Sequence, residues 1–332
     1  MPSRKTPLIL DTDMSPDSWI AVLFAALHPD ANLLAVSVSG TGEAHGPRGA
    51  RNARRLLSLA GKTDVRVGFG PPDPLKGSEH FPWLMRFIID RLLWQRVPQS
   101  AQPAPAEDSI KMISEILRAS KEKITFAAVG PQTNLATVLS IHPELKKKVK
   151  AVHIMGGALD APGNIREVAS WKKNTTAEWN FFCDPLAAKT VIDSTVPVYL
   201  VPLDATNQIP VTVDFVERLR SAGSSPAAEF AANLLHLLVV RLRAGAGFFL
   251  WDPITTACAL DEKLAEFSKR LVDVVTDPGE DWGRVFDSHD GTEINAANTL
   301  DRARFEETII RVLNRQRILR NVFPKTKFTV KN

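Results

Sequence analysis

The feature that most constrains this sequence is the repeated alternation of short apolar, β-branched runs with longer stretches of helical periodicity. This alternation is typical of βαβ units and predicts a mostly parallel sheet flanked by helices. The 332 residues, 44% of them hydrophobic, are enough to bury a sizeable core. We therefore predict an α/β fold built on an open, mostly parallel sheet, in a single domain that spans residues 1–332.

Local patterns place the elements of this fold. Strands are predicted at Leu8–Asp11, Leu33–Val38, Val65–Gly68, Ile124–Val129, Ala151–Met155 and Val196–Val201, with strand-like segments at Leu271–Val275 and Arg284–Phe286. Apolar residues that recur about every 3.6 positions predict helices at Ser18–Leu27, Gly49–Ala60, Ser109–Ser120, Pro185–Ile192 and near Arg304–Leu313. The stretch Val97–Asp108, rich in Pro, Ala and Gln, is predicted to be a loop over the sheet.

Composition excludes several classes of protein. The net charge is only +4, and the one basic run, Lys146–Lys148, indicates a solvated helix end rather than a nucleic-acid surface. No apolar run approaches the roughly 20 residues that a membrane span needs, and the apolar stretch before Asp11 is too short for the core of a signal peptide. Cys183 and Cys258 have no metal-site spacing and suit a reducing compartment. We expect a cytoplasmic protein that binds neither nucleic acid nor membrane.

Polar residues follow the predicted strands at the edge of the sheet where ligands bind in parallel α/β folds, beyond the carboxyl ends of the strands. Asp11, Asp13 and Asp17 come after the first strand. Other polar or glycine residues in such positions, or further along the chain, are Thr41, the GPQTN run of residues 130–134, Gly156, Glu178, Asn180, Asp204 and Asp252. We expect the chemistry of this protein to lie at that edge.

The three clustered aspartates allow two interpretations. Asp17 ahead of an apolar helix can be a helix N-cap with no further role. A second acidic residue at the mouth of a buried strand costs stability unless something compensates, which favours a functional role for Asp13. Carboxylates brought within a few ångströms repel one another, so the cluster indicates a hard divalent cation held by oxygen ligands.

Taken together, the motifs of this chain resemble those of the nucleoside hydrolase family, the inosine-uridine-preferring hydrolases. The run LDTDMSPDSWIA at residues 10–21 resembles the family's DxDxGxDDxxA signature. The elements GPQTN, MGGA, GN, AEWNFFCDPLAAK and WDP follow in the family's order. The resemblance runs from about Pro7 to Asp252, which is most of the chain.

The resemblance implies hydrolysis of the N-glycosidic bond of a ribonucleoside or a related ribosyl compound, with release of free base and ribose, as in purine and pyrimidine salvage. It implies that Asp13 binds calcium and acts as the general base on a metal-held water. The further calcium ligands would be Asp252, the residue at position 18, which is Ser18 here, and the main-chain carbonyl of Thr133. It also implies a homodimer or homotetramer. The substrate contacts that it implies are Asp17, Thr41, Met155, Asn164, Glu178, Trp179, Asn180 and Trp251.

These residue types suit the reaction. Cleavage of an N-glycosidic bond develops positive charge on the sugar, which nearby carboxylates stabilise while one of them deprotonates the attacking water. A metal ion lowers the pKa of that water and orients the sugar diol.

Three positions depart from the family's pattern. Ser18 replaces the second Asp of the paired DD and removes a carboxylate that would bind calcium with both oxygens, so calcium affinity should fall. Thr41 stands where an Asn is usual, which shortens or removes a sugar contact. Trp251 stands where some members carry a His that protonates the base, and an indole cannot act as an acid. Trp251 can stack on the base instead, and His80 is our candidate for a catalytic polar group near the base.

Two other interpretations remain open at this point. The chain could be a catalytically weakened relative that binds a ribosyl ligand without turning it over. It could also be a phosphatase of the haloacid-dehalogenase type with magnesium, because DxD after an apolar strand opens that family as well. A phosphatase of that type would need a downstream lysine and a later acidic pair in fixed places. The GPQTN and WDP motifs would have no role in it. The base that is accepted depends on loops, which these patterns do not specify.

Overall fold

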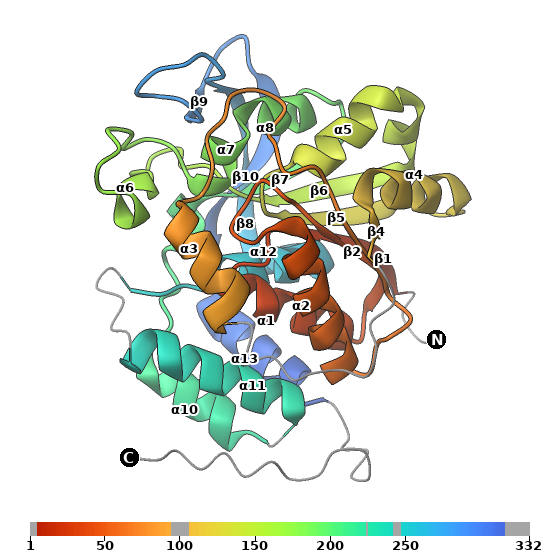
Figure 1. Cartoon of the computed structure of the whole chain (residues 1–332), viewed down its shortest axis with the longest axis vertical. Coiled ribbons are helices and arrows are strands. Elements are labelled where there is room, and N and C mark those ends of the chain that lie inside the picture. Colours follow the sequence, from red (N-terminus) through yellow and green to blue (C-terminus); the bar gives the residue numbers. More distant parts are fainter. Residues whose placement is uncertain (1–4, 94–105, 224, 242–246, 316–332) are drawn as a thin grey trace.

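The computed structural model describes residues 5–93, 106–223, 225–241 and 247–315. Their strands form a ten-stranded sheet with the order β4-β3-β2-β1-β5-β6-β7-β10-β8-β9 (Figure 1). The strands are β1 (Thr6–Thr12), β2 (Ala31–Val38), β3 (Arg66–Phe69), β4 (Glu107–Asp108), β5 (Ile124–Val129), β6 (Val149–Met155), β7 (Val198–Val201), β8 (Ala265–Val274), β9 (Val285–Asp287) and β10 (Thr292–Leu300). Neighbours from β4 to β10 pair in parallel, whereas β8 is antiparallel to both β10 and β9. The predicted α/β fold with a mostly parallel sheet is confirmed.

Strand β1 lies in the middle of the parallel part, paired with β2 on one side and β5 on the other. Its residues Leu8, Ile9 and Leu10 have no exposed surface. A continuous apolar run is what a parallel strand needs, because helices cover both of its faces. This explains why the apolar runs located the six predicted parallel strands to within a few residues.

Helices cover both faces of the sheet (Figure 1). On one side of the sheet lie α1 (Pro16–Leu27), α2 (Gly46–Leu59), α12 (Trp251–Leu260) and α13 (Arg302–Leu313). Outside them, α10 (Val213–Ser221) and α11 (Pro226–His236) pack against α13, and α11 also contacts α1. The other face packs against α4 (Ser109–Ala119), α5 (Thr133–Ile141) and α8 (Pro185–Ile192). Short helices α3 (Trp83–Ile88), α6 (Ile165–Val168), α7 (Trp179–Cys183) and α9 (Leu203–Thr206) lie in the connections. Within the described residues, no helix is long and apolar enough to cross a membrane.

The C-terminal part of the sheet differs most from the prediction. The strand-like segments at 271–275 and 284–286 correspond to the end of β8 and to β9, but β10 was not predicted. Its sequence, TEINAANTL, mixes polar and apolar residues because part of the strand is exposed. The loop predicted at 97–108 lies mostly outside the described residues, and its last two residues form β4.

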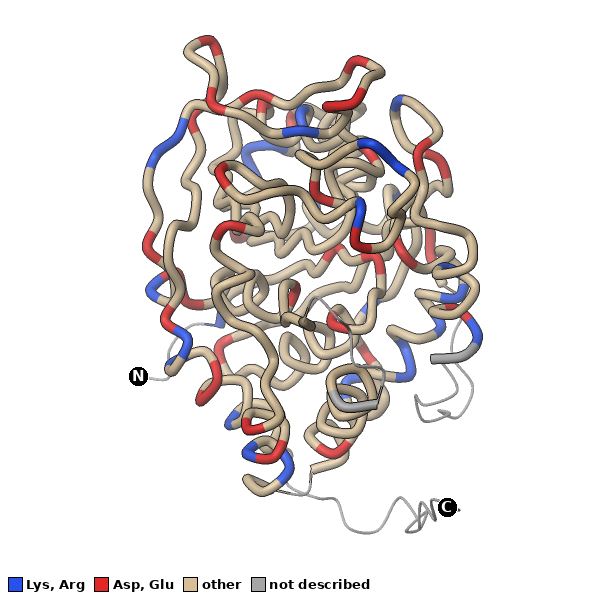
Figure 2. The backbone as a smooth tube through the Cα atoms, turned by 90° about the vertical axis from the view of Figure 1, so that its left-hand side faces the viewer, with Lys and Arg blue, Asp and Glu red and all other residues tan. Residues whose placement is uncertain are grey.

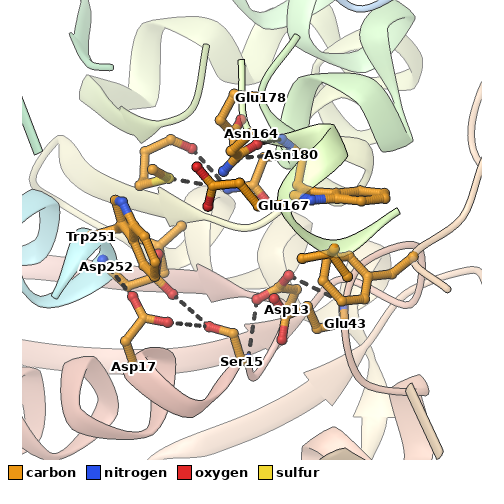
Figure 3. A pocket seen from close by; sticks show the side chains of 15 residues that line it. Asp13, Ser15, Asp17, Glu43, Asn164, Glu167, Glu178, Asn180, Trp251 and Asp252 are labelled. Atoms are coloured by element: carbon orange, nitrogen blue, oxygen red, sulfur yellow. Dashed lines mark hydrogen bonds between the residues drawn. The ribbon is translucent and has the colours of Figure 1, made fainter. Parts of the chain in front are cut away.

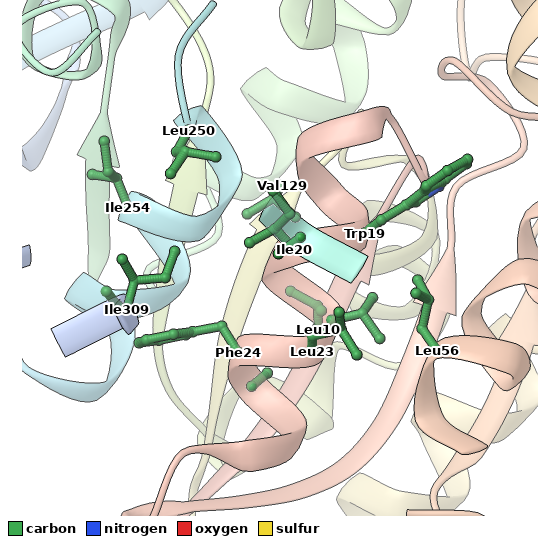
Figure 4. Close-up of a cluster of buried hydrophobic side chains, with 14 of the residues drawn as sticks. Leu10, Trp19, Ile20, Leu23, Phe24, Leu56, Val129, Leu250, Ile254 and Ile309 are labelled. Atoms are coloured by element: carbon green, nitrogen blue, oxygen red, sulfur yellow. The ribbon is translucent and has the colours of Figure 1, made fainter. Parts of the chain in front are cut away.

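Helix α1 is the centre of the larger hydrophobic core. Its side chains Ile20 and Phe24 lie among residues of the sheet and of helices α12 and α13, with Ile254 and Ile309 nearby (Figure 4). Phe24 has no exposed surface. The helix that follows the aspartate-rich turn is therefore fixed by apolar packing along its length.

We expect Phe24→Ala to lower the free energy of unfolding by about 3–5 kcal/mol, because it removes a fully buried aromatic ring and leaves a cavity. Urea unfolding followed by circular dichroism measures this change. Trp83→Ala is the matched control, since the Trp83 side chain is 70% exposed and its loss should change stability by no more than about 0.5 kcal/mol. Equal effects of the two variants would contradict the assignment of α1 to the core.

Candidate active site

The turn between β1 and α1 shapes one wall of the site. Met14 adopts a left-handed backbone conformation with φ of 59°, and its N–H donates to Thr12 Oγ1 at 3.0 Å. Ser15 caps α1 by accepting from the N–H of Ser18. The buried Trp19 indole donates to the carbonyl of Met14 at 3.0 Å. These contacts fix the turn between the sheet and the helix core, and Asp13 and Asp17 lie on either side of it.

Two glycines make room for Asp13. A Cβ atom at Gly42, in the loop after β2, would come within 2.2 Å of Asp13 Cβ. A Cβ atom at Gly130, after β5, would come within 2.6 Å of the Asp13 nitrogen. The loop after β2 also supplies a hydrogen bond, because the N–H of Glu43 donates to Asp13 Oδ2 at 3.1 Å. The Asp13 carboxylate is thus held by the backbone of neighbouring connections.

The structure brings Asp13, Asp17 and Asp252 together, although Asp252 lies at the start of the distant helix α12 (Figure 3). The N–H of Asp252 donates to Asp17 Oδ2 at 3.0 Å. The Ser15 hydroxyl lies 2.7 Å from Asp17 Oδ1 and 3.2 Å from Asp252 Oδ2. The Ser18 hydroxyl donates to Asp252 and lies 3.3 Å from Asp13 Oδ1. Two serine hydroxyls therefore bridge the three carboxylates.

Asp13, Ser15, Asp17 and Asp252 line a cavity of about 110 Å³ that opens to solvent. Figure 3 shows acidic and aromatic side chains around it. The lining residues are Asp13, Ser15, Asp17, Glu43, Phe81, Val129, Met155, Asn164, Glu167, Val168, Glu178, Trp179, Asn180, Trp251 and Asp252.

The opposite wall comes from β6 and α7. Glu178 caps α7 and accepts from the N–H of Asn180 at 2.9 Å. The Asn180 amide donates to the carbonyl of Met155 at 3.0 Å, and Asn164 Oδ1 accepts from the N–H of Trp179 at 3.1 Å. The buried indole N–H of Trp179 has no hydrogen-bond partner among the described residues. These five sequence-predicted contacts are all on one wall.

Burial raises the pKa of every carboxyl group in this cluster. It raises the pKa of Asp13 to about 6 and that of Glu178 to about 7. The pKa of Asp252 lies well above its usual range, first because of burial and then because of the charges of Asp17 and Asp13. In the described part of the chain, no lysine or arginine lines the cavity to offset these charges. The site therefore favours binding of positive charge.

The possible ligand atoms are oxygens, which calcium prefers, but they are few. Asp13 and Asp252 offer carboxylate oxygens, and Ser18 offers a hydroxyl between them. Among the residues with described positions, no three Asp, Glu, His or Cys side chains have the spacing of a metal site. Calcium normally takes six to eight oxygen ligands, with carboxylates among them. Two carboxylates and one hydroxyl are fewer than that, so a calcium ion at this place would be held weakly.

Thr41 and Thr133 are fully buried and do not line the cavity. Their hydroxyl groups are 3.0 Å apart, and the Thr133 hydroxyl donates to Asp184 at 2.7 Å. The carbonyl of Thr133 accepts from the Thr137 hydroxyl at 2.7 Å. The structure thus places the side chains of these two residues in the support of the site rather than in its wall.

His80 likewise does not line the cavity, whereas its neighbour Phe81 does. Burial lowers the pKa of His80, and the positive charge of Arg86 lowers it further. The imidazole is therefore mostly neutral at neutral pH and poorly placed to protonate a leaving base. Trp251 does line the cavity, and its indole N–H donates to Asn207 at 3.0 Å.

Sequence reasoning missed several residues of the wall. Ser15 stands at the glycine of the family's DxDxGxDD pattern, and its hydroxyl bridges two of the aspartates. Glu43, Phe81 and Glu167 lie in connections outside the quoted motifs. The only signal for Glu43 was its position shortly after β2, close to the ligand edge of the sheet.

Comparison with known proteins gives a consistent result. The inosine-uridine preferring nucleoside hydrolase family matches residues 8–307. The chain is 33% identical over 282 residues to the pyrimidine-specific ribonucleoside hydrolase RihA of Enterobacter sp. (strain 638), covering 81% of this chain and 84% of that protein. It is 32% identical over 260 residues to RihA of Shewanella sp. (strain MR-7), covering 76% of each.

Solved structures agree in fold. A plant nucleoside hydrolase, PpNRh1, is similar with a TM-score of 0.82 and 25% identity, over 93% of this chain and 99% of that one. An inosine-uridine preferring nucleoside hydrolase from Bacillus anthracis has a TM-score of 0.80 and 24% identity, over 94% of this chain and 100% of that one. The protein therefore belongs to the inosine-uridine preferring nucleoside hydrolase family, whose members are glycosidases that cleave the N-glycosidic bond of ribonucleosides.

Proposed function

We propose that this enzyme hydrolyses a ribonucleoside or a related riboside with Asp13 as the base that deprotonates the attacking water. The observation that carries the proposal is the convergence of Asp13, Asp17 and Asp252 on the same cavity as Glu178 and Asn180. A pKa of about 6 for Asp13 suits a base that works near neutral pH.

In this reaction water attacks the anomeric carbon of the ribose while its proton passes to Asp13. The bond from that carbon to the base nitrogen breaks, and the nitrogen keeps both electrons and takes a proton from solvent. Positive charge that develops on the sugar is stabilised by the buried carboxylates of Asp17 and Glu178 across the cavity. The hydrogen bonds that Glu178 accepts from three backbone N–H groups hold it in place. Asn164 and Asn180 would position the sugar hydroxyls on the same wall.

Calcium, where bound, would be held by Asp13, Asp252 and the Ser18 hydroxyl, with the main-chain carbonyl of Thr133 as a further ligand. When bound, such an ion lowers the pKa of a coordinated water and orients the sugar diol. The residues of this chain still supply the base and the charged wall.

The aromatic residues Trp251 and Phe81 would contact the base. Both line the cavity, and Phe81 packs on Trp179 with ring centroids 4.5 Å apart. The RihA relatives are pyrimidine-specific by name. Uridine and cytidine therefore come first in a substrate panel, with inosine added because of the family.

The two alternative functions now differ in support. A haloacid-dehalogenase-type phosphatase is not supported, because the family match is to nucleoside hydrolases and a carboxylate-lined cavity would repel phosphate. A catalytically weakened relative is favoured by one observation, the serine at position 18 in place of a carboxylate. That alternative predicts riboside binding without release of free base.

The resemblance supports an assembly, and the spacing of Cys183 and Cys258 suits a reducing compartment. We propose a homodimer or homotetramer in the cytoplasm, acting on a small ribosyl substrate. Light scattering during size-exclusion chromatography tests the assembly directly.

Replacement of Asp13 tests the proposed base. We expect Asp13→Asn to lower kcat/KM by about 10²–10⁴-fold, the usual contribution of a general base, while the circular dichroism spectrum stays unchanged. Release of free base from uridine, cytidine and inosine is the measurement. Asp290→Asn is the control, because Asp290 is exposed in the turn between β9 and β10. If the Asp13→Asn variant hydrolyses these ribonucleosides as fast as the wild type, Asp13 is not the base.

Replacement of Ser18 tests the metal site. We expect Ser18→Asp to bind calcium at least about tenfold more tightly than the wild type by isothermal titration calorimetry, because it adds a carboxylate next to Asp13 and Asp252. In a chelator, the same variant should melt at a lower temperature than the wild type, since another buried charge is unpaired. Ser18→Ala is the control that adds no charge. Identical calcium affinities of wild type and Ser18→Asp would contradict this site.

A further inference from the structure

Arg86 is a buried cation that has no part in the proposed mechanism. Figure 2 shows Lys and Arg spread over several separate segments of the chain rather than gathered at one place. In the described part of the chain, Arg86 is the only one of them that is buried, with 7% of its surface exposed. It lies on α3 and does not line the cavity. Burial of a cation costs free energy unless its N–H groups find acceptors, so the contacts of Arg86 indicate its role.

The acceptors are two main-chain carbonyls of one loop, the β2–α2 loop (residues 39–45), which connects β2 to α2. Nη2 of Arg86 donates to the carbonyl of Gly40 at 2.7 Å and to that of Ala44 at 3.3 Å. Nε of Arg86 is buried and has no hydrogen-bond partner among the described residues. The two bonds from Nη2 therefore join α3 to both ends of the loop.

The segment Ile89–Leu93, which continues α3, holds the same loop at a further point. Its residue Asp90 accepts from the N–H of His45 at 3.1 Å and also contacts the His45 ring. Burial lowers the pKa of Arg86, whereas the nearby negative charges of Asp90 and Asp13 raise it. The guanidinium therefore keeps its charge beside the loop, since an arginine is not deprotonated in proteins.

The loop that Arg86 holds is also the loop that holds Asp13. The N–H of Ala44 donates to the Asp13 carbonyl at 3.0 Å, and the N–H of Glu43 donates to Asp13 Oδ2 at 3.1 Å. Gly42 lies so close that a Cβ atom there would come within 2.2 Å of Asp13 Cβ. A displacement of the β2–α2 loop would therefore move the Asp13 carboxylate or release one of its oxygens.

We propose that Arg86 is a positioning residue for the reaction: by holding the carbonyls of Gly40 and Ala44, it keeps the β2–α2 loop against Asp13 and so fixes the orientation of the base. This inference rests on the proposed role of Asp13 and adds a residue that acts on it from outside the cavity. Such support matters because misplacement of a reacting group by about 1 Å can lower a rate by about 10²-fold.

Kinetics of Arg86→Met test the effect on the reaction. We expect kcat to fall by about tenfold, because the base is less well oriented, while KM stays within about twofold, because the wall from β6 and α7 is unchanged. Arg86→Lys should keep most of the activity, since both carbonyls accept from one nitrogen and an ammonium group can donate to both. Arg118→Met is the matched control, because it removes the same charge from an exposed side chain on α4.

A double-mutant cycle separates positioning of Asp13 from a general structural role. The measurement is release of free base from uridine, cytidine and inosine, followed with the substrate that the wild type hydrolyses fastest. In the Asp13→Asn background, we expect Arg86→Met to lower kcat/KM by no more than about twofold, because the group that Arg86 orients is already lost. A further loss of about tenfold in that background would show that Arg86 acts independently of Asp13 and would overturn the inference.

Amide hydrogen exchange tests the loop itself without turnover. We expect the N–H groups of Glu43 and Ala44 to exchange at least about tenfold faster in Arg86→Met than in the wild type, since the loop opens more often. Exchange within α1 should not change. Arg86→Lys should restore slow exchange, and Arg118→Met should leave it as in the wild type. Arg86→Gln, which removes the same charge, takes the place of Arg86→Met in every comparison if the latter does not fold.

The outcomes distinguish this inference from the proposed function. Base release by the wild type, combined with unchanged exchange of Glu43 and Ala44 or unchanged kcat in Arg86→Met, would overturn the inference and leave the proposed function standing. Absence of base release from every ribonucleoside by the wild type would overturn the proposed function, and the role of Arg86 in the reaction with it.

Discussion

The burial of three mutually repelling carboxylates is the constraint around which this site is organised. Asp13, Asp17 and Asp252 share a cavity in which burial raises the pKa of each. Asp17 and Asp252 lie in the first turns of α1 and α12, where the positive ends of the helix dipoles stabilise negative charge. The hydroxyls of Ser15 and Ser18 add hydrogen bonds. These contacts offset part of the cost of burial, and the remainder is available to a bound cation or a cationic transition state.

The hydrophobic core makes that arrangement rigid. Trp19 is fully buried, and its indole N–H holds the carbonyl of Met14 in the turn that separates Asp13 from Asp17. Helices α1 and α12 also contact each other directly, so Asp252 is positioned by the same packing that positions Asp17. Apolar burial thus contributes to function here, because it fixes the distances between charges that would otherwise move apart.

The sequence predicted the parts of the structure that depend on local pattern. Buried parallel strands are continuous apolar runs, and the motif of Asp13 and Asp17 stands directly after one of them. Strand β10 was missed because it is partly exposed and polar. Glu167 was missed because its place in the wall depends on how the connection after β6 folds back over the cavity, which no local period records. His80 was favoured for its chemistry, but the backbone presents Phe81 to the cavity instead.

The substitution at position 18 and the extra acids at positions 43 and 167 bear on the same balance of charge. Serine in place of aspartate removes one negative charge beside Asp13 and Asp252, which weakens the attraction for a divalent ion. Glu43 and Glu167 add carboxyl groups to the cavity outside the metal-binding motif. Glu43 lies beside the same centre, because its N–H donates to Asp13 Oδ2, and burial together with the charges of Asp13 and Asp17 raises its pKa. The serine thus removes a carboxylate ligand without removing the acidic character of the cavity, so the groups that would stabilise positive charge on the sugar remain in place.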